Sequence, residues 1–198
     1  MIGFLKENSY SMVKMFVNQI GMTVFGTMLA LATAGNPTLL LCSSIFAILF
    51  YLFLLYSVGW EIGAKDKIRI DGGRMAEFPA KGFLIALGAN LPNLLLAVLM
   101  GAGALISTAT GAEWAGSMSV VCNAIARLIE GMYLGVIKVL EDMLPAGHSI
   151  LDVWWWFLLL PLPAIFTGWF SYFLGSRNIR ILGLFGITPI GSGNKNSH

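Results

Sequence analysis

The chain has 198 residues, of which 57% are hydrophobic and 11% are charged, and its formal net charge is +2. Soluble globular domains carry about 25% charged residues, so this chain has too little charge to cover a water-facing surface. The small net charge argues against nucleic acid as a partner, and the length suits a single membrane domain over residues 1–198.

Four stretches approach the roughly 20 apolar residues that span a hydrocarbon core. They cover residues 15–34, 38–60, 82–107 and 153–175, with almost no charged side chains. The sequence therefore predicts an all-α integral membrane protein, a bundle of four transmembrane helices plus one amphipathic or re-entrant helix. Its first partner is the lipid bilayer. No small-residue cleavage site follows the first stretch, which we expect to remain as an anchor.

The first two spans form a predicted helical hairpin, because Gly35-Asn36-Pro37 interrupts the apolar pattern. Thr38 is the expected cap of the second helix. A hydrophilic loop is predicted over residues 61–81, and the alternation at 67–71 suits a short strand. This loop carries five basic residues, which places it in the cytoplasm by the positive-inside rule.

The third span contains polar residues, because Asn90 and Asn93 lie about midway along 82–107. As i and i+3 residues they share a helix face, and their carboxamides need partners within the protein because lipid offers none. Pro92 is expected to leave the Gly88 carbonyl without its usual donor. The pattern fits a polar site on a kinked transporter helix, and it also fits hydrogen bonds that only hold helices together.

Residues 117–144 are predicted as an amphipathic helix with its polar side chains on one stripe. These side chains are Asn123, Arg127, Glu130, Lys138 and Glu141. Arg127 and Glu130 stand three residues apart with opposite charge and are expected to pair. The segment either lies at the outer interface or dips into the membrane, or it crosses as a fifth transmembrane helix with its stripe facing inward.

Charge counting favours four spans. If the basic loop is cytoplasmic and 117–144 does not cross, ten of the 12 Lys and Arg residues lie inside, and the other two belong to 117–144 itself. Both termini are then cytoplasmic, and the expected location is the bacterial cytoplasmic membrane. If 117–144 crosses, the tail at 176–198 lies outside instead.

Cys42 and Cys122 lie in apolar stretches and are expected to be small buried hydrophobes. No metal site, cofactor or catalytic residue is predicted from these patterns. The site hypothesis is instead a polar intramembrane cluster that binds a transported substrate. Its members are Asn90, Asn93, Asn123, Arg127 and Glu130, with Asn18 and Gln19 as further candidates.

Three functional hypotheses follow from these residues. The first is a small transporter or the membrane-embedded subunit of a transport system. The second is an accessory or scaffold protein that binds other membrane proteins or a second copy of itself. An intramembrane enzyme ranks third, because only Arg127 and Glu130 resemble a catalytic pair.

Overall fold

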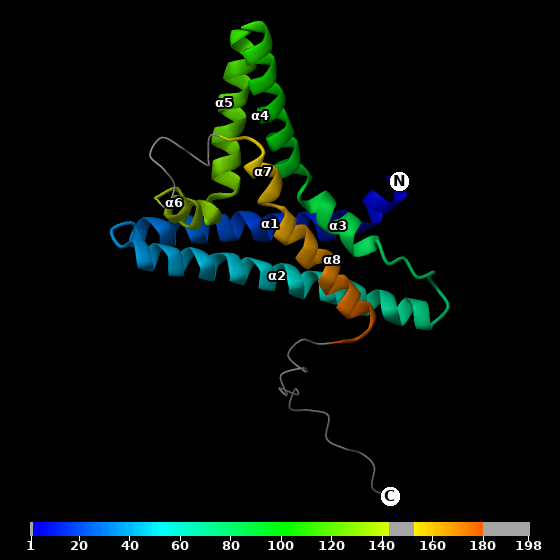
Figure 1. The fold of residues 1–198 in the computed structure, drawn as a ribbon. Coiled ribbons are helices and arrows are strands. Elements are labelled where there is room, and N and C mark those ends of the chain that lie inside the picture. Colours follow the sequence, from blue (N-terminus) through cyan, green and yellow to red (C-terminus); the bar gives the residue numbers. More distant parts are fainter. Residues whose placement is uncertain (1, 143–152, 180–198) are drawn as a thin grey trace, which may run out of the picture.

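The computed structural model in Figure 1 describes residues 2–142 and 153–179. All regular secondary structure in these residues is helical. Four helices are long and apolar enough to cross a membrane, which confirms the all-α class and the predicted number of candidate spans. They are Gly3–Thr33, Pro37–Asp71, Leu91–Thr110 and Trp156–Ser176. The predictions for the tail beyond residue 179 lie outside the described residues.

Helices α1 (Ile2–Thr33) and α2 (Pro37–Asp71) form the first hairpin. Its second helix is capped by Asn36 and not by Thr38, because the Asn36 carboxamide oxygen accepts from two backbone N–H groups at 3.0 and 3.2 Å. Pro37 opens α2, where a missing N–H breaks no helical hydrogen bond. The 35 residues of α2 extend over about 50 Å, farther than the roughly 30 Å of a hydrocarbon core.

Helix α2 continues well beyond Trp60, so the predicted loop 61–81 is helical over its first half, including the expected strand. Ion pairs between successive turns favour helix there. Lys65 contacts Glu61 at 2.6 Å, and Lys67 contacts Asp71 at 3.1 Å. The helix ends at Asp71, and the chain turns at Gly73, whose φ of 66° suits glycine.

The third predicted span is divided, because α3 (Lys81–Ala89) and α4 (Leu91–Thr110) meet at Asn90. Asn90 has φ −92° and ψ 2°, which ends the first helix. Pro92 lies in the first turn of α4, where its ring is tolerated. The segment long enough to span a membrane begins only with α4. Asn90 and Asn93 therefore lie at the N-terminal end of that segment, whereas the sequence placed them near its middle.

The predicted helix 117–144 is divided as well. Helix α5 (Glu113–Ile129) begins four residues earlier than predicted, and Glu130 is its C-cap. A 3-10 turn, η1 (Gly131–Tyr133), and helix α6 (Leu134–Asp142) follow in a direction bent by 72° from α5. The predicted polar stripe is thus split between two helices that point in different directions.

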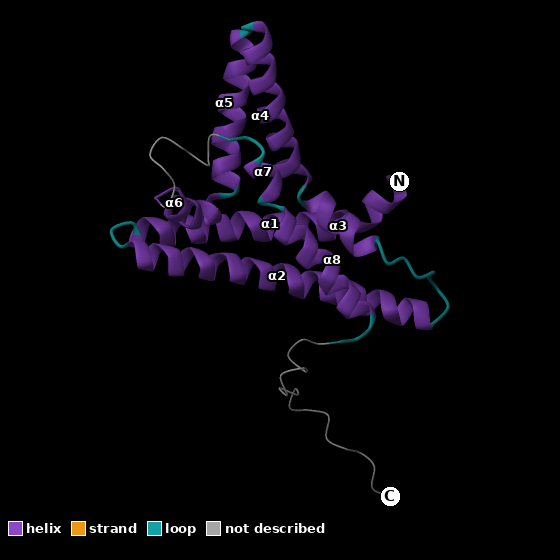
Figure 2. Cartoon of the chain, in the orientation of Figure 1, coloured by secondary structure: helices purple, strands orange, loops and turns teal. Residues whose placement is uncertain are grey.

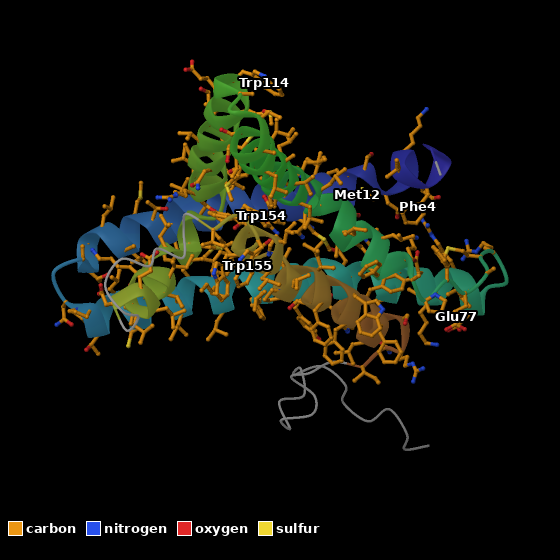
Figure 3. The ribbon with its side chains drawn as sticks, turned by 45° about the horizontal axis from the view of Figure 1, so that its top comes forward. Phe4, Met12, Glu77, Trp114, Trp154 and Trp155 are labelled. Atoms are coloured by element: carbon orange, nitrogen blue, oxygen red, sulfur yellow. The ribbon has the colours of Figure 1, made fainter. Side chains whose placement is uncertain are left out.

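Figure 1 shows two parts. α1 and α2 lie side by side as a long pair, with α8 (Leu162–Ser176) across α2. α4 and α5 form a second hairpin that stands across the first, with α7 (Trp156–Leu159) beside its base. Figure 2 shows that the connection within each hairpin is short. Figure 3 places Trp114 at the tip of the second hairpin and Trp154 near its base.

Two apolar clusters form the core. The larger lies around Tyr51 and Ile85, and it is formed by residues of α1, α2, α3, η1, α6 and α8. The smaller lies between α4, α5 and α7, around Phe157. Cys122 is buried in the smaller cluster as expected, whereas Cys42 is exposed on α2. The prediction of burial therefore holds for one cysteine and is wrong for the other.

Helices α2 and α8 approach closely because glycines line their contact. A Cβ atom at Gly63 would lie 2.2 Å from the carbonyl oxygen of Tyr172. One at Gly175 would lie 2.2 Å from the carbonyl oxygen of Trp60. Rotation of a side chain cannot relieve a clash with the backbone, so these glycines set the distance between the two helices.

We expect Gly63→Ala to lower the melting temperature of the detergent-solubilised protein, because the added methyl group must push α8 away. Overpacking of this kind costs about 1–3 kcal/mol. Gly21→Ala is the matched control, since nothing lies within 4 Å of the Cβ position at Gly21. Tryptophan fluorescence follows the unfolding. Equal melting temperatures for the two variants would contradict the close contact between α2 and α8.

Candidate functional site

Two adjacent turns of α1 hold the base of the second hairpin. The buried Gln19 accepts a hydrogen bond at Oε1 from Asn93 Nδ2, at 2.9 Å. One turn later, the Thr23 hydroxyl donates to the backbone carbonyl of Ile129 at 2.5 Å. One face of α1 therefore contacts both the start of α4 and the end of α5 through polar groups.

Asn90, Asn93 and Gln19 form one buried amide cluster. The two asparagines meet as their spacing predicts, with Asn93 Nδ2 at 3.3 Å from Asn90 Oδ1. Asn90 Nδ2 donates back to the carbonyl of Ala86 at 2.9 Å. The carboxamide oxygen of Asn93 has no hydrogen-bond partner among the described residues. Of the two further candidates on α1, Gln19 joins this cluster and Asn18 does not.

The Gly88 carbonyl stands four residues before Pro92. Pro92 does lack the N–H that would reach it in a continuous helix. The backbone N–H of Asn90 donates to the carbonyl oxygen of Ala86 at 3.1 Å. Helix α3 closes its last turn before the proline, and the Gly88 carbonyl as a free acceptor stays a prediction.

The breaks at Asn90 and Glu130 lie at the same end of the second hairpin. α4 has 20 residues and α5 has 17, and the two helices run antiparallel. At 1.5 Å per residue, the breaks lie about 30 and about 26 Å from the connecting turn. The hydrogen bond from the Ser119 hydroxyl to the Met100 carbonyl, at 2.9 Å, agrees with this register. Two interrupted helices therefore present their ends to one face of α1.

Glu130 is buried at the second break. Its side chain is turned inward, with the residue only 3% exposed, and Oε2 has no hydrogen-bond partner among the described residues. The buried hydroxyl of Tyr133 likewise lacks a partner there. Tyr51 of α2 and Tyr133 are both buried in the larger apolar cluster, together with Met132 of the turn that follows Glu130. This carboxyl group is thus enclosed by aromatic and apolar surroundings.

Arg127 and Glu130 do not form the predicted ion pair. Arg127 Nε donates to Asn123 Oδ1 at 2.5 Å, and no ion pair joins Arg127 to Glu130 within the described ranges. The break explains this, because α5 ends at Ile129 and Glu130 has φ −103° and ψ 19°. The i,i+3 geometry of a continuous helix is therefore lost. The structure brings Asn90, Asn93 and Glu130 to the breaks and leaves the Asn123–Arg127 pair along α5.

The groups at the breaks are amides, a hydroxyl and a carboxyl, and no nucleophile is paired with a general base among them. Burying a charge without a partner is unfavourable. A carboxyl in the position of Glu130 therefore favours a bound proton or a bound cation. This chemistry suits ion binding better than covalent catalysis.

A second buried polar group lies where the sequence indicated a solvated loop. Lys81 Nζ contacts Asp66 Oδ2 at 2.8 Å, and the two side chains are only 8% and 3% exposed. The Tyr172 hydroxyl donates to the same oxygen at 3.1 Å. One signal in the sequence could have revealed Asp66. It follows Gly63 by three residues and so continues the face that packs against α8.

We expect Lys81→Met to destabilise the protein strongly, because it strands the Asp66 carboxylate in a buried position. Removing one member of a buried ion pair costs about 3–5 kcal/mol. The double variant Asp66→Leu with Lys81→Met removes both charges and should recover most of that loss.

Lys67→Met is the matched control for this comparison, since Lys67 pairs with Asp71 in an exposed position and should matter by less than ~1 kcal/mol. Thermal unfolding in detergent measures all three variants. A double variant no more stable than Lys81→Met alone would show that the stranded carboxylate is not the cause.

No protein family matches this chain, and neither a curated protein nor a solved structure matches it. The functional assignment therefore rests on the residues and contacts described above.

Proposed function

We propose that the chain is an integral membrane protein whose four long apolar helices lie in the bilayer, while α5, η1 and α6 dip into it as a re-entrant segment. The lengths and apolar composition of the four helices support this proposal. The surface of α2 supports it too, because Leu49, Phe50 and Phe53 are exposed there, as lipid-facing side chains are. The alternative is that the bent segment crosses as a broken fifth span.

The proposed orientation places the charged end of α2, the loop at 72–80 and both termini in the cytoplasm of a bacterial cell. Its support is the positive charge of this end, to which Lys65, Arg69 and Arg74 contribute. The tip of the second hairpin, at residues 108–116, carries Glu113 and no Lys or Arg.

A membrane-impermeant thiol reagent added to intact cells should label a cysteine at Ala109 and should miss one at Ala76. Both alanines are exposed, and replacing Cys42 and Cys122 with serine leaves only the probe to react. Ala76→Cys should react once the cells are permeabilised. A third probe at Gly193 stays unlabelled with four spans and is labelled with five. External labelling at Ala76 would refute the orientation.

We propose further that the protein is a small transporter or the membrane-embedded subunit of one, with its polar site at the two helix breaks. The observation that carries this proposal is the buried Glu130, whose Oε2 lacks a partner among the described residues. Acidic residues inside membrane segments are rare and usually functional. Transporters use interrupted helices to present polar groups within the bilayer. In this proposal Glu130 exchanges a proton or a monovalent cation next to the amide cluster of Gln19, Asn90 and Asn93.

Dicyclohexylcarbodiimide, an apolar reagent that couples to protonated carboxyl groups, should modify the detergent-purified protein at Glu130. Na⁺ or alkaline pH should protect the carboxyl, because each removes the proton that the coupling requires. Glu130→Gln should give no adduct. Glu77→Gln, which changes an exposed carboxyl, should give the same adduct as the wild type. The mass of the intact protein reports the adduct.

In the same experiment, the variant Asn93→Leu distinguishes an amide cluster that binds the ion from one that only packs helices together. If the amide cluster contributes to the ion site, this variant loses protection by Na⁺ while it stays folded, since one interhelical hydrogen bond is worth only about 1 kcal/mol. A Glu130 carboxyl that reacts equally at every pH, with and without Na⁺, would refute the transport proposal.

A scaffold is the second candidate function, and it has an observation of its own. The second hairpin exposes large apolar side chains on both helices, among them Leu105, Val120 and Leu128. Such a surface suits another membrane protein or a second copy of the chain. The polar residues at the breaks then serve only to hold helices together. A stoichiometric complex that survives purification, with no ion protection of Glu130, would favour this function.

A further inference from the structure

A charged cavity of about 220 Å³ lies where α1 and α2 separate. In Figure 1 the N-terminal end of α1 turns away from α2, and the start of α3 lies between them. Side chains from all three helices line this cavity, including Ser11 of α1, Arg69 of α2 and Lys81 of α3. It is separate from the helix breaks, because none of Asn90, Asn93 or Glu130 lines it.

Lys81 is the buried cation of this cavity. Its ammonium group has three N–H donors, and its one partner among the described residues is Asp66 Oδ2, at 2.8 Å. That oxygen is shared with the Tyr172 hydroxyl. Two donors of a buried charged group are therefore left for a ligand. Leaving such donors unsatisfied is unfavourable, and an acceptor in the cavity would relieve it.

The walls add further donors. Arg69 carries five N–H donors and makes no side-chain hydrogen bond or ion pair within the described part of the chain. Lys14 and Lys65 share one carboxylate, that of Glu61, at 3.5 and 2.6 Å. With Glu7 as the third carboxylate, the lining has four cations and three anions.

We propose that this cavity binds an oxyanion of the phosphate type, held mainly by Lys81 and Arg69. The lining has one excess positive charge. The several oxygens of a phosphate group match ammonium and guanidinium donors in charge and geometry. Lys14 and Lys65 add positive potential, since one carboxylate cannot neutralise both.

Two kinds of ligand could bring a phosphate group to this cavity. The cavity lies beside the part of α2 just beyond Trp60, which is the level of lipid headgroups in the proposed orientation. A phosphate-bearing headgroup can therefore reach it, and so can free phosphate from the cytoplasm. The site does not depend on ion exchange at Glu130. Only the lipid source rests on the proposed membrane location.

The test measures the melting temperature of the full chain in neutral detergent during titration with one of three probes. These are inorganic phosphate, short-chain phosphatidic acid and short-chain diacylglycerol, which is the same lipid without phosphate. We expect phosphatidic acid to stabilise the protein and diacylglycerol to have no effect. Arg69→Gln should weaken the apparent affinity about tenfold. Arg74→Gln is the matched control, because Arg74 is exposed and outside the cavity lining.

The double variant Asp66→Leu with Lys81→Met removes the buried cation without stranding a charge, and it should bind neither phosphate probe. Stabilisation by inorganic phosphate and phosphatidic acid alike supports a site for the oxyanion itself. Stabilisation by phosphatidic acid alone supports the lipid source. The proposal is overturned if neither probe stabilises the wild type, or if Arg69→Gln and Arg74→Gln respond identically.

Discussion

A helix that is interrupted in an apolar environment needs hydrogen-bond partners for the polar groups at its break. Helix α1 supplies such partners at both breaks. The Gln19 carboxamide and the Thr23 hydroxyl, one turn apart, bind Asn93 at the start of α4 and the Ile129 carbonyl at the end of α5. These two bonds fix the base of the second hairpin on the first pair of helices. They also bring both breaks to one level. The burial of Glu130 and the bend before α6 follow from that arrangement.

Local properties of the sequence predict the helical class and the four apolar segments, because the hydropathy of a segment depends only on its own residues. The breaks depend on contacts between residues far apart in the sequence, which local patterns do not contain. Gln19 and Asn93 are separated by 74 positions, and Thr23 and Ile129 by 106. Asn90 and Asn93 were recognisable, since two amides stand out in an apolar stretch. The expected pairing of Arg127 with Glu130 failed because it assumed a continuous helix. Asp66 was missed because α2 was expected to end at Trp60.

The two polar regions differ in chemistry in a way that follows from the cost of burying charge. The helix breaks hold neutral amides and a single carboxyl, whereas the cavity between α1 and α2 holds ion pairs. Asp66 is buried with both a cation and a hydroxyl donor, which is how a buried carboxylate is normally stabilised. Glu130 has neither among the described residues. This contrast makes Glu130, and not Asp66, the carboxyl that calls for a functional explanation.

The two parts of the fold are also held together by different kinds of contact. α2 and α8 meet backbone to backbone at Gly63 and Gly175, and the Asp66–Lys81 pair with Tyr172 ties α2, α3 and α8 at one end. At the base of the second hairpin, two side-chain hydrogen bonds to α1 lie beside a carboxyl oxygen that has no hydrogen-bond partner among the described residues. In the proposed function, a change in the charge of Glu130 acts on the bend between α5 and η1. The α2–α8 pair then serves as the fixed part against which that bend moves, because its glycine contacts leave no room for a closer approach.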